Sequence, residues 1–390
     1  MAYLRNSTVN LLNLHYGIHA LVLSGAGAFF AVYLLKSGVP VPTVMASFAA
    51  ILLGRLFIRP LILVLALRVG LRATVAIGTI VSAVQYLILS EVHGVDPMLL
   101  AVIVAASIGD TIYWTSYHAY FAQLGDAEHR GHQIGAREAL AAAAAIIGPL
   151  LVAWALTSFG PRAAFWSAAA VQVLAALPFL GTPDVAVKRE APGAFRAALP
   201  GVLLFLADGW TASGAYFVWQ IALFLLLGQS FQAFGGVLAL AGVVGALGGL
   251  VLGRHIDAGH GGRTVMIAYG GYAALILFRA ATTGNVALAV IANALGSLVG
   301  AVYASALLTA VYNLSKRSPC TLRFQIAAEG GWDLGGSGAA LLAAALSAAG
   351  FPLWTAILPA LAGTGLSIHL LLHYYAKDAR IVPVIEAPPA

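Results

Sequence analysis

Two arginines lie four residues apart inside an almost unbroken apolar stretch, ASFAAILLGRLFIRPLILVLAL, residues 46–67. Positions four apart share one face of a helix, so Arg55 and Arg59 point the same way. A charged side chain at the centre of a membrane helix costs about 2.5–3.5 kcal/mol, and it normally faces a partner or a water-filled cavity. Pro60 loosens the adjacent turn and can bring water to it. The two arginines therefore either contact a solute or hold a fixed ion pair.

A carboxyl group and three aromatic rings share one face of a second apolar stretch, GDTIYWTSYHAYF, residues 109–121. The four residues recur at helical spacing: Asp110, Tyr113, Trp114 and Tyr117. Tyrosine and tryptophan combine an apolar ring with a polar tip, so such a stripe serves either for packing or for solute binding.

Acidic residues characterise the C-terminal half. Asp208 precedes Tyr216, Trp219 and Gln220 in one apolar stretch, and Glu329, Trp332 and Asp333 lie in another, RFQIAAEGGWDLGGSGAA. Burial disfavours a charged carboxylate, so such acids are candidate proton carriers. Glu329 and Asp333 could instead pair with Arg323 or loop arginines. The surrounding glycines allow helices or a ligand to approach closely.

Two histidines, His15 and His19, are also four residues apart in the first apolar stretch. Three roles stay open for them: metal binding, proton handling or solute contact, and structural hydrogen bonding. No carboxylate or third ligand stands beside them in sequence, so we expect neither a metal nor another cofactor.

The elements that position these residues must be membrane helices. Of the 390 residues, 61% are hydrophobic and 9% are charged, and the mean hydropathy is +0.93; soluble domains are about 25% charged. We therefore predict an all-α polytopic membrane protein. The only cysteine, Cys320, excludes an internal disulfide framework.

Turn residues and charges divide the sequence into twelve apolar segments that are long enough to span a bilayer. Their approximate ranges are 10–35, 41–66, 73–91, 97–122, 137–158, 163–181, 199–227, 233–253, 264–281, 285–312, 323–348 and 352–375. Most Lys and Arg residues fall on the side of the two termini, and only Lys36, Arg162 and Arg279 are assigned to the other side. This distribution predicts cytoplasmic termini. It also explains the formal charge of +6 without nucleic-acid binding.

The longest polar segment between spans divides the chain into two nearly equal halves. We expect a six-helix bundle over 1–182, a cytoplasmic linker over 183–198, a second six-helix bundle over 199–376 and a cytoplasmic tail over 377–390. Such a duplicated arrangement is typical of transporters that hold a solute between two rocking bundles.

A short turn motif suggests the family. In VLGRHIDAGHGGRTVM, residues 251–266, Gly253, Asp257, Gly261 and Arg263 resemble the glycine, acid and arginine loop of the major facilitator superfamily. The corresponding turn of the first half, LALRVGLRATV, keeps Arg68, Gly70 and Arg72 but has Leu67 at the place of the acid. In the family, such turns latch neighbouring helices in one conformation. The first-half copy lacks one latch residue.

The resemblance has further implications for the fifth span and for Arg55. Gly148 and Pro149 partly match the Gly-Pro core of a motif found in proton-driven exporters of the family. Arg137 and Glu138 open the same span and are interpreted as a gating ion pair. Spans two and four are neighbours in the family fold, so Asp110 is the expected partner of Arg55.

The sequence thus favours a proton-coupled secondary transporter that moves a small polar, charged or zwitterionic organic solute across the inner or plasma membrane by alternating access. Export is favoured over uptake. The expected partners are the solute, protons and membrane lipids, and a monomer is expected. The alternatives are an uptake symporter for an organic anion, a lipid flippase on the same fold and, less favoured, a membrane-embedded enzyme.

Overall fold

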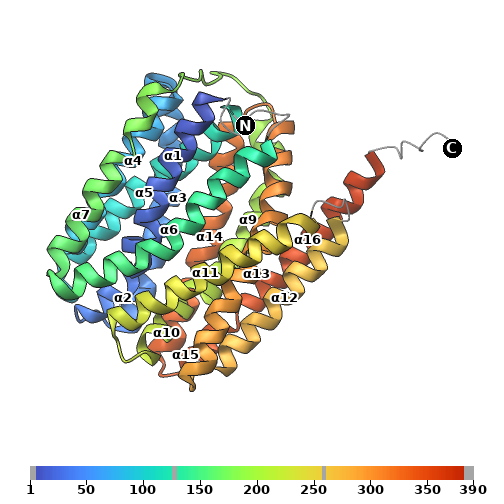
Figure 1. Ribbon diagram of the computed structural model, residues 1–390. Coiled ribbons are helices and arrows are strands. Elements are labelled where there is room, and N and C mark those ends of the chain that lie inside the picture. The colour runs from blue at the N-terminus through green and yellow to red at the C-terminus, as the bar shows by residue number, and fades with distance from the viewer. Residues whose placement is uncertain (1–5, 125–129, 257–260, 382–390) are drawn as a thin grey trace.

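The computed structural model describes residues 6–124, 130–256 and 261–381, and these residues form helices and connecting turns (Figure 1). Residues 6–181 contain α1 (Ser7–Val22), the π turn η2 (Leu23–Gly27), α2 (Ala28–Lys36), α3 (Val41–Val69), α4 (Leu71–Leu89), α5 (Pro97–Leu124), α6 (Arg130–Ser158), α7 (Gly160–Leu174) and η3 (Leu177–Gly181). The later residues contain α8 (Ala194–Ala197), α9 (Leu199–Ala212), the π turn η4 (Ser213–Val218), α10 (Trp219–Leu226), α11 (Phe231–Ile256), α12 (Gly261–Ala281), α13 (Val286–Arg317), α14 (Thr321–Ala348), α15 (Leu353–Ile357) and α16 (Ala360–Ile381).

Ten of the helical segments within the described residues are long and apolar enough to cross a membrane. Two more segments correspond to expected spans. The apolar part of α13, Val286–Gly300, is shorter, and α14 carries three charged residues, Arg323, Glu329 and Asp333. The all-helical membrane class predicted from composition is confirmed, and the count of twelve spans stays a prediction.

The two halves of the chain lie side by side, and two pairs of helices make the most extensive contacts between them. In Figure 1 the helices coloured blue to green lie mainly to the left, and those coloured yellow to red lie to the right and below. Between the halves, α3 packs along α14, and α6 packs along α11. Residues on α3 and α14 can therefore meet directly across the boundary.

The first segment of each half contains a π turn with the same three residues. Ser24-Gly25-Ala26 lies within η2, and Ser213-Gly214-Ala215 lies within η4. Each serine donates a hydrogen bond to a backbone carbonyl of another helix: Ser24 to Ala144 on α6 at 2.8 Å and Ser213 to Gly336 on α14 at 2.7 Å. This equivalence supports an internal duplication, and π turns inside helices often mark functional sites.

Glycines allow α9 and α14 to pack with their backbones almost in contact. A Cβ atom on Gly331 would lie 2.2 Å from the carbonyl oxygen of Val202, and one on Gly335 would lie 2.0 Å from that of Leu206. No side chain fits at such distances. The close approach fixes the position of α14, and with it the position of Glu329 and Asp333.

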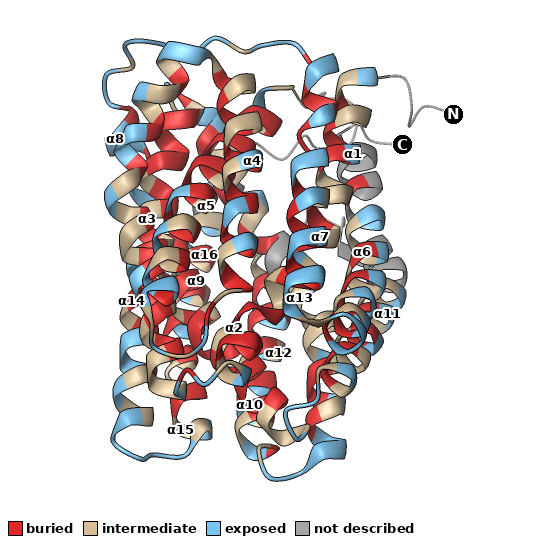
Figure 2. Cartoon of the chain, turned by 90° about the vertical axis from the view of Figure 1, so that its left-hand side faces the viewer, coloured by how far each residue is buried: buried red, intermediate tan, exposed pale blue. Residues whose placement is uncertain are grey.

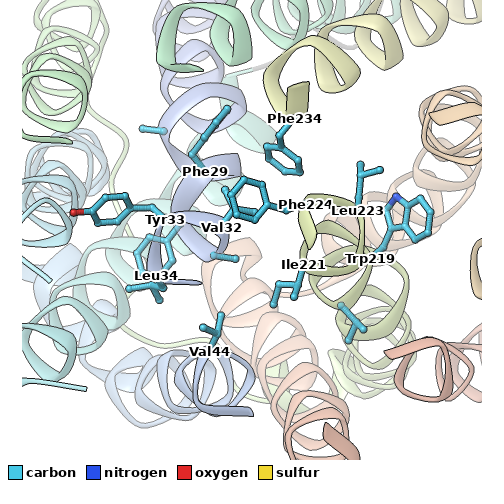
Figure 3. Packing of buried hydrophobic residues seen from close by; sticks show 14 of the residues in the cluster. Phe29, Val32, Tyr33, Leu34, Val44, Trp219, Ile221, Leu223, Phe224 and Phe234 are labelled. Atoms are coloured by element: carbon cyan, nitrogen blue, oxygen red, sulfur yellow. The ribbon is translucent and has the colours of Figure 1, made fainter. Parts of the chain in front are cut away.

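Apolar side chains fill the end of the molecule opposite the linker. Figure 3 shows Phe29 and Val32 of α2 close to Phe224 of α10 and Phe234 of α11, so this cluster joins the two halves. Figure 2 shows buried residues on the faces that helices turn toward one another and exposed residues on the outer faces and in the loops. Large apolar side chains such as Phe57 and Leu61 lie on outer faces, as expected of helices in contact with lipid.

Candidate functional site

The two arginines of α3 face the protein interior. Arg55 and Arg59 are 9% and 2% exposed, whereas Phe57, which lies between them in sequence, is 77% exposed. The helix therefore turns its apolar side outward and its charged side toward α14. Pro60 lies inside the continuous α3 helix.

Arg59 is the centre of a buried ion-pair network between the two halves. Its Nη1 atom donates to Glu329 Oε2 at 2.6 Å and to Thr115 Oγ1 at 2.6 Å. Its Nε atom donates to Asp333 Oδ2 at 2.9 Å, and its Nη2 atom also binds that oxygen. Glu329 and Asp333 are spaced one helical turn apart on α14, so both can reach the same guanidinium.

Arg55 joins the same network through Asp333, with Nε 2.9 Å from Oδ1. Both atoms lack a hydrogen bond of acceptable geometry, so the contact is an ion pair by distance and is less well directed than the contacts of Arg59. The partner expected from sequence, Asp110, lies within electrostatic range of Arg55, but the close ion pair of Arg55 is with Asp333. Asp110 instead accepts a hydrogen bond from Gln85 Nε2 at 3.1 Å, because α4 and α5 pack closely through Gly78 and Gly109.

Trp332 connects this network to a third acid of the second half. Its Nε1 atom donates to Asp208 Oδ2 at 2.9 Å, and Arg55 lies over its ring with Cζ 5.4 Å from the centroid. Asp208 is 9% exposed, and its Oδ1 atom has no hydrogen-bond partner. Asp208 therefore has a free acceptor that a proton or a solute could use.

The histidines occupy different environments. His15 Nδ1 lies 2.6 Å from the Ala175 carbonyl oxygen, and Nε2 lies 3.0 Å from the Tyr113 hydroxyl, so both nitrogens have partners. His19 Nδ1 lies 3.1 Å from Gln172 Oε1, whereas its buried Nε2 atom has no partner. His15 thus fits the structural role, and His19 retains a nitrogen for chemistry. Among the described residues, no group of three potential ligands is arranged for a metal ion.

The aromatic residues predicted to bind solute divide into packed and accessible ones. Tyr113 and Tyr117 are buried and stack on each other, with ring centroids 5.5 Å apart. Trp219 is also buried, and its Nε1 atom donates to Asn293 Oδ1 at 3.0 Å. Trp114 and Trp332 are partly buried, and Tyr216 is exposed.

Gln220, one turn after Tyr216, is 8% exposed, and its Oε1 atom is without a hydrogen bond. It is therefore a candidate acceptor on the same face as the exposed tyrosine.

The first-half turn obtains its acid from the linker. Gly70 has φ +82°, a conformation that favours glycine, and a Cβ atom there would collide with the carboxylate of Asp184. Asp184 Oδ1 accepts from the Arg72 backbone N–H at 3.0 Å, and the Arg72 side chain donates to the Thr182 carbonyl at 3.0 Å. Arg68 is exposed. Asp184, about 115 positions later, thus replaces the acid that is missing at Leu67. The sequence alone did not predict this replacement.

The second-half turn is only partly described. Asp257 lies outside the described residues, as do the surroundings of Gly253 and Gly261, and Arg263 is exposed in the first turn of α12. The side chain of Glu138 is likewise outside them. Arg137 is 7% exposed, and its Cζ atom lies 4.8 Å from the centroid of the Tyr16 ring and 5.2 Å from that of Phe121. The proposed gating pair stays a prediction.

The sequence left open a pairing of Arg323 with Glu329 or Asp333, but the structure gives Arg323 other partners. Its Nη1 and Nη2 atoms donate to the backbone carbonyls of Lys188 and Arg189 at 2.8 and 2.5 Å. The linker thus contacts the second half here and the first half at Arg72. Arg323 is removed from the acids of α14 because it ties the start of that helix to the linker.

Comparison with known proteins identifies the class of this chain. The family model described as Major Facilitator Superfamily matches residues 12–319, most of the chain. The human organic anion transporter MFSD10 (TETRAN) has a similar structure, with a TM-score of 0.67, 15% sequence identity, and coverage of 95% of this chain and 99% of that one. An auto-inhibited peptide transporter of the POT family matches with a TM-score of 0.64 and 12% identity over 98% of this chain and 99% of that one. No curated protein matches by sequence.

The family match identifies the chain as a membrane transporter rather than an enzyme. It belongs to the Major Facilitator Superfamily. The resemblance inferred from the turn motifs is thereby confirmed, and the two structural neighbours establish the fold alone at these identities.

Proposed function

We propose that this chain is a proton-coupled secondary transporter that moves a small polar, charged or zwitterionic organic solute across the inner or plasma membrane by alternating access. The observation that carries the proposal is the ion-pair network of Arg55 and Arg59 with Glu329 and Asp333, which joins α3 of one half to α14 of the other. The network has two positive and two negative groups. It is neutral when intact, and any change in one member alters the attraction between the halves.

Within this proposal, Arg55 and Asp208 are the groups that exchange partners. Arg55 has the less directed contact with Asp333, and Asp208 has a free oxygen, while Trp332 touches both residues. Protonation of Asp208 or binding of a solute beside Trp332 would shift Arg55 and weaken its pairing with Asp333. Arg59 would remain as the structural anchor because it binds two carboxylates and Thr115.

The two moving bodies are proposed to be 1–182 and 199–376, with 183–198 as the linker on the cytoplasmic side together with both termini. The likeness to an organic anion transporter and to a peptide transporter is compatible with a polar or charged solute. Export remains the favoured direction. Gly148 of the partial exporter motif packs directly on the π turn of the first segment, where a Cβ atom would lie 2.9 Å from the Gly25 nitrogen.

The second candidate function is uptake of an organic anion that binds to Arg55. The structure gives it less support than the sequence does, because Asp333 and Glu329 already balance both arginines of α3. An anion at Arg55 would have to displace Asp333.

Transport in reconstituted vesicles tests the proposal. Purified protein is first screened against small metabolites by thermal shift, since a ligand of the folded state raises its stability. Hits are then measured as radiolabelled flux with and without a pH gradient. We expect flux that responds to the gradient, loss of this response in Asp208→Asn, and normal behaviour in Asp96→Asn, a control acid in the loop before α5. Gradient-independent flux, or no flux of any stabilising ligand, would contradict proton-coupled transport.

A spectroscopic experiment tests alternating access without knowledge of the solute. Spin labels at Val95→Cys and Phe351→Cys, two exposed positions in loops of different halves, are placed in a Cys320→Ser background. Alternating access predicts at least two label distances whose populations change with pH. A single distance that is unchanged by pH, and unchanged again in Asp333→Asn, would count against it.

A further inference from the structure

Arg279 is a buried charge that the ion-pair network does not use. Arg279 lies near the end of α12, and its place in the sequence assigned it to the membrane side opposite the two termini. It is nevertheless only 7% exposed and packs inside the second half. Its Cζ atom lies 5.0 Å from the centroid of the Trp219 ring, and Nη1 donates to the carbonyl of Ala215 within the π turn η4. Gly296 of α13 provides the space for its Nη2 atom.

The Arg279 guanidinium has no counter-charge among the described side chains. Among the side chains that the structure describes, no carboxylate forms an ion pair with Arg279, and its buried Nε atom has no hydrogen-bond partner. A buried charge without a partner is costly, and a carbonyl oxygen neutralises only part of it. By contrast, Arg55 and Arg59 are balanced by two acids, so Arg279 is better able than either of them to accept an incoming anion.

Tyr216 gives this charge a route toward the boundary between the halves. Tyr216 is 47% exposed, and it lies within electrostatic range of both Arg279 and Tyr86 of α4. The next residue, Phe217, stacks on Phe48 of α3 with ring centroids 4.6 Å apart. Tyr216 therefore lies where the two halves meet, within reach of Arg279.

We propose that Arg279 is an anion-binding subsite for the transported solute, receiving a carboxylate-type group past Tyr216. The anion binds the free Nε edge of the guanidinium, a strong, charge-assisted contact, and the ring of Tyr216 contacts the adjoining part of the solute. This inference rests on the proposed transport of a polar solute and names its chemical class. Arg279 rather than Arg55 then selects for the negative charge.

Equilibrium binding of benzoate tests the subsite, with benzyl alcohol as the neutral counterpart of similar shape. The full chain is placed in phosphatidylcholine nanodiscs, and the melting temperature is followed against ligand concentration. Benzoate is expected to stabilise the protein and benzyl alcohol to have little effect. Arg279→Gln should weaken benzoate binding by at least about tenfold, a loss of about 1.4 kcal/mol. Arg162→Gln, which removes an exposed arginine paired with Glu91, should bind as the wild type does.

Two further variants cover the case in which Arg279→Gln is unstable. Arg279→Lys keeps the charge and should retain part of the binding, and Tyr216→Ala removes the ring that contacts the solute and should weaken binding moderately. If Arg279 only clamps α12 to the π turn, Arg279→Gln lowers the melting temperature but leaves the benzoate shift intact, and the inference is overturned. Equal stabilisation by benzyl alcohol overturns it as well.

The source of the anion is distinguished by adding phosphatidylglycerol to the nanodiscs. A solute site predicts an unchanged benzoate shift, whereas Arg279-dependent competition would assign the anion to a lipid headgroup and overturn the solute assignment. Because binding is measured at equilibrium, the subsite can stand even if proton-driven flux is absent. Conversely, coupled flux that persists unchanged in Arg279→Gln removes the subsite and leaves the proposed function intact.

Discussion

Arg59 on α3 holds Asp333 on α14 through two of its nitrogens, with Nε 2.9 Å from Oδ2, although the residues are 274 positions apart. The same carboxylate lies 2.9 Å from Nε of Arg55. One acid of the second half thus pairs with two arginines of the first, and Glu329 provides the second negative charge. The charges that look anomalous in an isolated apolar helix therefore link the two halves.

Loss of Asp333 should therefore cost more stability than loss of Glu329. Asp333→Asn leaves Arg55 without its ion-pair partner and weakens the hold on Arg59, and breaking a buried pair from one side costs about 3–5 kcal/mol. Glu329→Gln leaves Arg59 with Asp333, and the amide can still accept a hydrogen bond, so its cost should be smaller. Thermal unfolding in matched nanodiscs measures both.

The double variant Asp333→Asn with Arg55→Gln is the control for this prediction. It removes one charge of each sign and should recover part of the lost stability. If the double variant is no more stable than Asp333→Asn alone, charge imbalance is not the cause.

The two arginines should also differ from each other. Arg59 is 2% exposed and donates to three side chains, whereas Arg55 is 9% exposed and has an ion pair with poorly directed geometry. Arg59→Gln leaves Glu329 and Asp333 with too little positive charge and should lower the melting temperature strongly. Arg55→Gln should have a smaller effect on stability and a larger one on solute binding or flux. Equal losses of stability would indicate that both arginines are anchors.

The sequence predicts which face of a helix carries function better than it predicts partners. The helical spacing of Arg55 and Arg59, and of Glu329 and Asp333, indicates a shared face for each pair, and the structure places both faces inward. The sequence pointed to Asp110 of the same half as the partner of Arg55, whereas the close ion pair is with Asp333 of the other half. Spacing along one helix says nothing about which helix of the other half lies opposite, and that depends on the glycine contacts that set the position of α14.

The sequence also does not predict the burial or the partners of single charged residues near the ends of spans. Arg279 and Asp184 lie where a loop or a membrane surface would accept a charge, so their types carry no signal of burial or of a specific partner. Asp184 could have been suspected because the first-half turn lacks its acid at Leu67. For Arg279 we find no such signal, because its burial follows from the packing of α12 on the π turn.

The close packing of α9 on α14 predicts that a side chain at the contact lowers stability, and the neighbouring glycine provides a matched control. Gly331→Ala places a methyl group 2.2 Å from the Val202 carbonyl oxygen, whereas Gly330→Ala makes ordinary contacts, with a Leu56 methyl group at 3.4 Å and Arg59 Cδ at 3.9 Å. Overpacking of this kind costs about 1–3 kcal/mol or more when the backbone must move. The Gly331 variant should melt at a clearly lower temperature than the wild type, and the Gly330 variant close to it. Similar melting temperatures for the two variants would show that the helices separate easily.

The loop before α5 gives a pH-dependent prediction outside the membrane-spanning segments. Asp96 Oδ1 accepts from the Leu99 N–H at 2.9 Å, and Oδ2 accepts from the His93 N–H at 2.9 Å. Hydrogen bonds from the backbone of His93 and Leu99 lower the pKa of Asp96 below its usual value. A carboxylate with a lowered pKa stabilises the folded state above its unfolded pKa, and this contribution is lost as the pH falls through the folded pKa.

Two substitutions separate the charge of Asp96 from its capping role. Asp96→Asn keeps an acceptor oxygen at the start of α5 and removes the titration, whereas Asp96→Ala removes both. Melting temperatures are compared from neutral pH, through about pH 3.9, the usual pKa of an aspartate, to a pH below the lowered pKa of Asp96. The difference between wild type and Asp96→Asn should be present at neutral pH and vanish at the acidic end, while Asp96→Ala stays less stable than Asp96→Asn throughout. A difference between wild type and Asp96→Asn that persists after acidification would mean that the carboxylate charge contributes nothing here, and that the amide simply fits the turn less well.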